Sequence, residues 1–293
     1  MKFRFLDSYD AYGVYALSVM KKCGPEVAPT DLAALLGAHT YKGDLTSEGE
    51  VACVSWLSDC DPWQDIYGIS NCRRALPTAL SQFRRDIGAR PVLDPSEVSK
   101  ISLKEKGFIN GCRVVEWGEY PQSITDEYTN KRLEELYSSS SLCSTGKNYT
   151  FDGVHPWQIA PPFEAESYPE YKLDDKRYIR IIPKGVTGGA GVFPTTGERF
   201  EKKPYWVQVE PVEWLMDDPT GIMVAKKCLF AGIQFNPEKI YRADLSTSFM
   251  QVYLDTYFSK EIEPKEPERT KELSKDFDPA TLRMAKLRSG RGI

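Results

Sequence analysis

The sequence predicts an α+β protein in which mixed or antiparallel sheets carry a few short helices. Short runs rich in β-branched and aromatic residues recur between Gly, Pro and Asp turn signals, and only a few segments space their apolar residues as helices do. The chain has 293 residues, of which 41% are hydrophobic, 27% charged and 12% aromatic. This composition is typical of a globular chain that can bury a sizeable core.

The most strongly marked strand lies within residues 203–221, where Val207 and Val209 are expected to face the interior. Pro211 cannot donate a ladder hydrogen bond, so it predicts an edge position or a bulge. Residues 217–221 carry turn chemistry, and residues 221–225 are expected to return as the hairpin partner. Further strands are expected over residues 2–6, 51–57, 90–93, 112–117 and 178–182.

Three segments show helical patterns. Thr30 is expected to cap a short helix that ends before Gly37. A second helix is expected from the Ser123-x-x-Asp126 signal through Tyr137. The clearest pattern covers residues 247–258, where apolar residues recur at helical spacing: Phe249, Val252, Tyr253 and Tyr257.

Composition divides the chain into five segments. Residues 96–110 are polar and turn-rich, which predicts a linker between an N-terminal α+β part (1–95) and an elaborating segment (111–199). Residues 200–262 form a hairpin–helix part. Residues 263–293 are expected to be an exposed charged tail, because they begin with a Pro- and Glu-rich run that cannot bury apolar surface.

Several functional classes are disfavoured. The chain has seven cysteines without a Cys-x-x-Cys pair and only two histidines, so we expect reduced thiols, no metal and no cofactor. A net charge of −4 and a pI near 5.5 give no general match to nucleic acid. The sequence shows neither a signal peptide nor an apolar run of the ~20 residues that a membrane span requires. We therefore expect a cytoplasmic protein without membrane association.

Glu210 and Glu213 are the first catalytic candidates, because paired carboxylates can act as general acid and base in a hydrolase. In a regular strand an i, i+3 pair points to opposite faces, so a shared site requires a bulge at Pro211. His155 is the remaining catalytic candidate, and it would need Cys112 or Cys143 nearby to form a nucleophilic pair.

Binding candidates lie in the N-terminal part. Nucleic-acid binding would require four arginines on one exposed face: Arg73, Arg74, Arg84 and Arg85. Trp63 and Tyr67 are aromatic binding candidates in the same region, although aromatics at strand spacing more often belong to a core.

Five motifs carry a resemblance to a known family: Arg90-Pro91-Val92-Leu93, Gly118-Glu119-Tyr120-Pro121-Gln122, Pro204-Tyr205-Trp206, Phe230-Ala231-Gly232-Ile233-Gln234-Phe235 and Tyr257-Phe258-Ser259-Lys260-Glu261-Ile262. With them the chain resembles a large family of uncharacterised bacterial proteins, common in gut Firmicutes and mobile elements, which has no assigned reaction. That family is more distantly similar to C-type-lectin-like and formylglycine-generating-enzyme folds.

The resemblance implies a permuted C-type-lectin-like core in which residues 1–95 and 200–262 pack as one body. The copper-binding cysteine pair of the formylglycine enzymes has no clear match here, so that activity is not implied. Such scaffolds more often bind than catalyse. Our leading prediction is a non-enzymatic binding protein with a protein partner, encoded by a phage or mobile element and acting on a host protein. The alternatives are a carboxylate-dependent hydrolase and a nucleic-acid-binding protein.

Overall fold

The computed structural model describes the following residues: 1–5, 30–36, 40–41, 52–60, 66–70, 74–78, 90–109, 111–152, 165–183, 200–230, 233, 246 and 248–264. The chain divides into two units, residues 1–262 and 263–293. Of the second unit only Glu263 and Pro264 are described, so the tail expected over residues 263–293 lies almost wholly outside the described residues.

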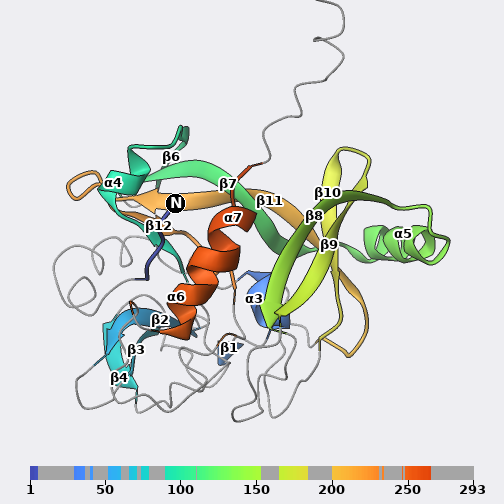
Figure 1. Ribbon diagram of the computed structural model, residues 1–293, viewed down its shortest axis with the longest axis horizontal. Helices are drawn as coiled ribbons and strands as arrows, with labels where there is room; N and C mark the ends of the chain where they lie inside the picture. Colours follow the sequence, from blue (N-terminus) through green and yellow to red (C-terminus); the bar gives the residue numbers. More distant parts are fainter. Residues whose placement is uncertain are drawn as a thin grey trace, which may run out of the picture. The chain divides into compact units, whose positions relative to one another are not determined.

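The described part of the first unit is dominated by an eight-stranded antiparallel sheet (Figure 1). Strand β11 is central: β7 pairs along one side of it, while β10 and β12 share the other side. Strands β9 and β8 extend the sheet beyond β10, β5 pairs with β12, and β6 pairs with β7. The strands are β5 Val92–Leu93, β6 Lys104–Ile109, β7 Cys112–Ile124, β8 Cys143–Asp152, β9 Ala165–Leu173, β10 Lys176–Ile181, β11 Tyr205–Met216 and β12 Met223–Ala225.

One face of this sheet carries the main hydrophobic core. Helix α6 (Phe249–Tyr253) continues through a π-helical turn (Leu254–Phe258) into α7 (Ser259–Glu261), and its apolar side chains pack on this face. Rings fill the contact: Tyr120 lies 5.2 Å from Phe258, and Phe230 lies 5.0 Å from the same ring. Buried aromatic pairs of this kind contribute beyond their area.

Gly118 lets α7 approach the sheet closely. Its φ is +77°, and a Cβ there would lie 2.9 Å from the carbonyl oxygen of Ile262. The adjacent Glu119 N–H donates to that same oxygen at 2.9 Å. A residue with a side chain would therefore be strained at this position and would push the helix end away.

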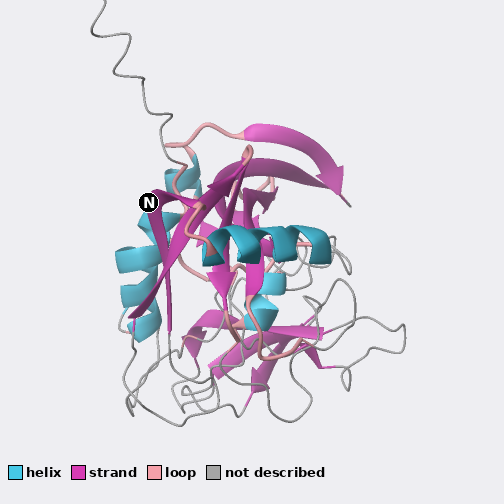
Figure 2. Cartoon of the chain, turned by 90° about the vertical axis from the view of Figure 1, so that its right-hand side faces the viewer, coloured by secondary structure: helices cyan, strands magenta, loops and turns pink. Residues whose placement is uncertain are grey.

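Helix α5 (Glu127–Ser138) covers part of the opposite face, so helices lie on both sides of the strands (Figure 2). The side chain of Asp126 caps it by accepting a hydrogen bond from the Thr129 N–H at 2.9 Å. Leu133 of α5 packs on two residues of the sheet, Tyr178 and Trp206. Successive side chains of β10 point to opposite faces of the sheet, so the two faces have separate cores. Ile179 faces the main core, while its neighbour Tyr178 faces α5.

The remaining described elements come from the N-terminal part. A four-stranded antiparallel sheet has the order β1-β2-β3-β4. Its strands are β1 Thr40–Tyr41, β2 Ala52–Cys60, β3 Ile66–Ser70 and β4 Arg74–Thr78, and the short helices are α3 Asp31–Leu35 and α4 Pro95–Val98. The Thr30 hydroxyl caps α3 by accepting from the Ala33 N–H at 3.0 Å, as expected.

The α+β class is confirmed, and so is the hairpin of β11 with β12. Residues 1–95 and 200–262 share strand pairing through β5 and β12, and Phe3 packs against Trp214 and Phe258. A permuted lectin-like core stays a prediction.

Two expectations need correction. Residues 96–110 are not an unstructured linker, because they include the end of α4 and the whole of β6, which is an ordered edge strand of the sheet. Its sequence is as polar as that of a loop because, within the described residues, only one of its edges is paired and most of its side chains are exposed. The described residues 1–5 contribute only one bridge, Arg4 to Val92, where a full strand was expected.

Candidate functional site

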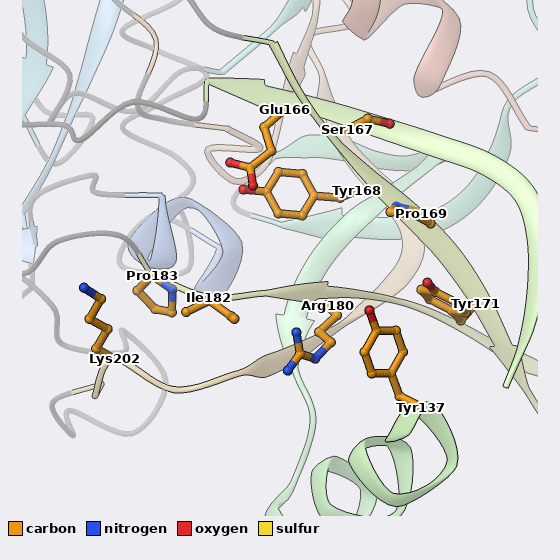
Figure 3. A pocket seen from close by; sticks show the side chains of 10 residues that line it. All are labelled: Tyr137, Glu166, Ser167, Tyr168, Pro169, Tyr171, Arg180, Ile182, Pro183 and Lys202. Carbon is orange, nitrogen blue, oxygen red and sulfur yellow. The ribbon is translucent and has the colours of Figure 1, made fainter. Parts of the chain in front are cut away.

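A pocket of about 410 Å³ lies on the α5 face of the sheet, over β9 and β10 (Figure 3). We call it the Tyr–Arg pocket. Aromatic and cationic side chains converge at one end, and Pro183 and Lys202 lie at the other. Its lining residues are Tyr137, Glu166, Ser167, Tyr168, Pro169, Tyr171, Arg180, Ile182, Pro183 and Lys202.

Helix α5 fixes the position of Arg180. The guanidinium makes two hydrogen bonds to the Glu134 carboxylate, Nε to Oε1 at 2.7 Å and Nη2 to Oε2 at 3.1 Å. The indole N–H of Trp206 donates to the same carboxylate at 2.6 Å. The bond to Glu134 raises the pKa of Arg180 further, so the side chain stays charged.

Three aromatic rings support this arrangement. Tyr137, Tyr171 and Trp206 lie in mutual edge contact, with all three pairs of ring centroids 5.7 Å apart. Arg180 stacks over the Tyr137 ring at 4.8 Å. Burial raises the pKa of Tyr171, and its neighbour Tyr137 raises it further, so the phenol stays neutral. The pocket therefore has an aromatic wall whose rings hold one another in place.

The same wall is partly open to solvent. Tyr137 is 39% exposed and Ile182 is 40% exposed, while Trp206 beneath them is fully buried. Lys202 is exposed and makes no ion pair with any residue that the structure describes. The arrangement can hold an apolar or planar group against the tyrosines and a negative charge near Lys202.

A second pocket, of about 380 Å³, lies where β11 bulges against β7. The register shifts between Pro211 and Glu213, and the amide of Gln122 donates to the carbonyl oxygens of Glu210 and Pro211 at 3.1 and 3.0 Å. We call this the bulge pocket. Its lining residues are Lys106, Glu116, Gln122, Glu210, Pro211, Glu213, Lys226 and Lys227. The bulge that a shared Glu210–Glu213 site requires is therefore present.

Lysines balance most of the carboxylates in the bulge pocket. Glu213 lies opposite Glu116 in the strand register, where two like charges would repel. Lys226 pairs with Glu213 at 2.8 Å, and Lys104 and Lys106 each pair with Glu116 at 3.0 Å. Burial raises the pKa of Glu116, but the hydrogen bonds from the two lysines outweigh it and lower the pKa overall. Glu116 therefore stays ionised at neutral pH.

A third polar group of residues lies on the core face of the sheet. Glu170 is fully buried, and its carboxylate accepts hydrogen bonds from Tyr149 at 3.0 Å and Thr145 at 2.7 Å. Arg177 contacts Glu170 and also pairs with Glu119. Burial raises the pKa of Glu261 to about 7, and its Oε2 has no hydrogen-bond partner among the described residues.

The other expected site residues are not brought together within the described part. Tyr67 lies in β3 opposite Pro77, and Arg74 lies in β4 opposite Ser70. The other five lie outside the described residues: Trp63, Arg73, Arg84, Arg85 and His155. Among the described residues, no group of three or more His, Cys, Asp or Glu side chains is placed to hold a metal ion.

The Tyr–Arg pocket was missed from the sequence. The sequence predicts a helix that runs through Tyr137 and a strand that contains Arg180, but nothing local indicates that the two side chains meet. The available signal was an alternation: Tyr178 and Arg180 share one face of β10, and a Tyr-rich helix is close in the sequence. Which helix would cover that face is decided by the tertiary structure.

Comparisons with models of protein families, with curated proteins and with solved structures find no match for this chain. The resemblance to uncharacterised bacterial proteins therefore stays a prediction. Within the described residues, no helix has the length and apolar character needed to cross a bilayer.

Proposed function

We propose that this protein is a binding protein that holds a segment of a protein partner in the Tyr–Arg pocket. The observation that carries the proposal is the preorganised, partly exposed aromatic wall of Tyr137 and Tyr171 with Arg180 stacked on it. Tyrosine and arginine are among the residues that most often dominate binding energy at protein interfaces.

Rigidity makes this wall suitable for binding. Arg180 is held by two hydrogen bonds and by its stacking on Tyr137, so little side-chain freedom remains to be lost on association. Immobilising a free long side chain at an interface costs about 0.5–1.5 kcal/mol. A partner that fills the pocket avoids much of this cost and desolvates the exposed part of the Tyr137 ring.

The lining indicates the chemistry of the partner segment. Tyrosine rings together with Pro169, Pro183 and Ile182 suit an extended segment with an aromatic or proline anchor. Lys202 suits an acidic residue beside that anchor. The expected origin of the partner, a host protein met by a mobile element, rests on the family resemblance alone.

The proposal can be tested by selecting peptides from a phage-displayed random library on the immobilised full chain. Enriched peptides should combine an aromatic or proline anchor with an acidic residue. Tyr137→Ala should weaken their binding by about 2 kcal/mol or more, as expected for a hot spot. Tyr128→Ala is a matched control, because Tyr128 lies on the same helix, is 77% exposed and is not part of the pocket lining. Equal loss in both variants, or no enrichment, would contradict the proposal.

Carboxylate-dependent hydrolysis is the second candidate, because the bulge pocket brings Glu210, Glu213 and Glu116 together. General acid–base catalysis at neutral pH requires one protonated carboxylic acid. Glu116 is held ionised and Glu213 is paired with Lys226, which favours binding over hydrolysis. Turnover of ester, peptide or glycoside substrates that Glu210→Gln abolishes would reverse this order. Nucleic-acid binding through Arg73, Arg74, Arg84 and Arg85 stays a prediction without support from the described geometry.

A further inference from the structure

We propose that the bulge pocket is a second, independent binding site, and that it takes a small zwitterion of the free amino acid class. The site is separate from the Tyr–Arg pocket, since the two share no lining residue. The inference rests on the shape of the bulge and on which of its charges are already paired.

The cavity results from the irregular pairing of β7 and β11. The register shifts between Pro211 and Glu213, and the main-chain carbonyls exposed by the shift need donors. Gln122, which is only 5% exposed, supplies one amide nitrogen to both of them. The hydrogen bonds from Gln122 therefore fix the backbone conformation of the bulge, and with it the position of the cavity beside it.

Among the described residues, one charge of each sign around the cavity has no ion-pair partner. Three lysines and three glutamates line it. Glu116 is paired with Lys106 as well as Lys104, and Glu213 is paired with Lys226. Glu210 and Lys227 are the two that form no ion pair with any residue of the described part of the chain.

This pattern selects a ligand with two opposite charges. An ammonium group would lie near Glu210 and a carboxylate near Lys227, so each charge of the pocket is matched and none is left partly desolvated without a partner. A phosphate would meet three carboxylates and a metal ion three lysines, so both are disfavoured. The volume of about 380 Å³ is ample for a free amino acid, and the polar lining favours a polar side chain.

The test uses the full chain and a panel of the free natural amino acids, with binding measured by isothermal titration calorimetry. At least one amino acid should bind saturably. The N-acetyl and methyl-ester forms of that amino acid each lack one charge and should bind at least about tenfold more weakly. Glu210→Gln and Lys227→Met should each reduce the affinity by about the same factor.

Controls separate this proposal from the first. Tyr137→Ala and Lys202→Met, in the Tyr–Arg pocket, should leave amino acid binding unchanged. Thermal melting of each variant verifies that the chain is folded, and the charge-blocked ligands test the idea on the unaltered protein. Three outcomes would overturn the proposal. The first is saturable binding that neither Glu210→Gln nor Lys227→Met weakens. The others are equal binding of the charge-blocked forms, and no saturable binding by any amino acid of the panel.

Discussion

The two faces of the large sheet use the same chemistry with different exposure. On the core face, the Glu170 carboxylate is fully buried, and its partner Arg177 also pairs with Glu119. On the α5 face, Glu134 pairs with Arg180 next to an open pocket, and its side chain is 28% exposed. The two arginines are about equally exposed, at 25% and 23%, so the difference lies in the carboxylates. A fully buried carboxylate can only support the fold, whereas one at a pocket edge can also face a ligand.

The largest expected effect comes from removing the fully buried carboxylate of Glu170. Glu170→Ala takes away the acceptor of the Tyr149 hydroxyl and one acceptor of the Thr145 hydroxyl. Unsatisfied buried donors, together with the cavity left by the truncated side chain, should cost about 3–5 kcal/mol. We expect a loss of this size in the free energy of unfolding, measured by urea denaturation.

Glu134→Ala is the matched comparison on the other face. Arg180 can turn to water, so the loss of stability should be smaller, about 1–3 kcal/mol, and should arise mainly from the unsatisfied Trp206 N–H. Equal losses in the two variants would show that exposure does not separate the two carboxylates.

The second prediction concerns pH and Glu261. Burial raises its pKa from 4.5 to about 7 in the folded chain. Between these values the folded state keeps a proton that the unfolded state has released, so stability falls as pH rises through this window. The loss amounts to about 3 kcal/mol by pH 8.

Glu261→Gln stays neutral at every pH and should remove this slope, making the variant more stable than the parent above pH 7. Glu127→Gln, on the exposed first turn of α5, serves as the control. Urea denaturation at pH 5 and pH 8 measures the difference. A parent whose stability does not fall between these two values would refute the assignment.

The smallest effect is expected from the cap of α5. Asp126→Ala removes the acceptor for the Thr129 N–H and should lower the free energy of unfolding by less than either glutamate variant. Since α5 carries Tyr137 and Glu134, the variant should also weaken peptide binding at the Tyr–Arg pocket while leaving amino acid binding at the bulge pocket unchanged. Weakening at both pockets would mean that the cap acts on the whole sheet.

Local features were predictable because neighbours in the chain create them. The cap at Thr30 and the β11–β12 hairpin depend on residues a few positions apart. The second helix was expected to begin with a capping box at Ser123, but Ser123 lies in β7 and Asp126 is the cap. The continuation of the last helix through a π-helical turn was not predictable, because it follows from packing against the sheet. The edge strand β6 was mistaken for a linker because an edge strand shares the polar composition of a loop.

The sequence by itself determined the α+β class, the positions of six of the twelve described strands and of the longer helices, and the condition that Glu210 and Glu213 meet only at a bulge. Only the tertiary structure decided that the bulge exists, that lysines from β6 and from the end of β12 reach it, and that Tyr137, Tyr171 and Arg180 form one wall. The physical reason is that side-chain alternation assigns a residue to one of two faces, whereas strand order and register decide which residues become its neighbours.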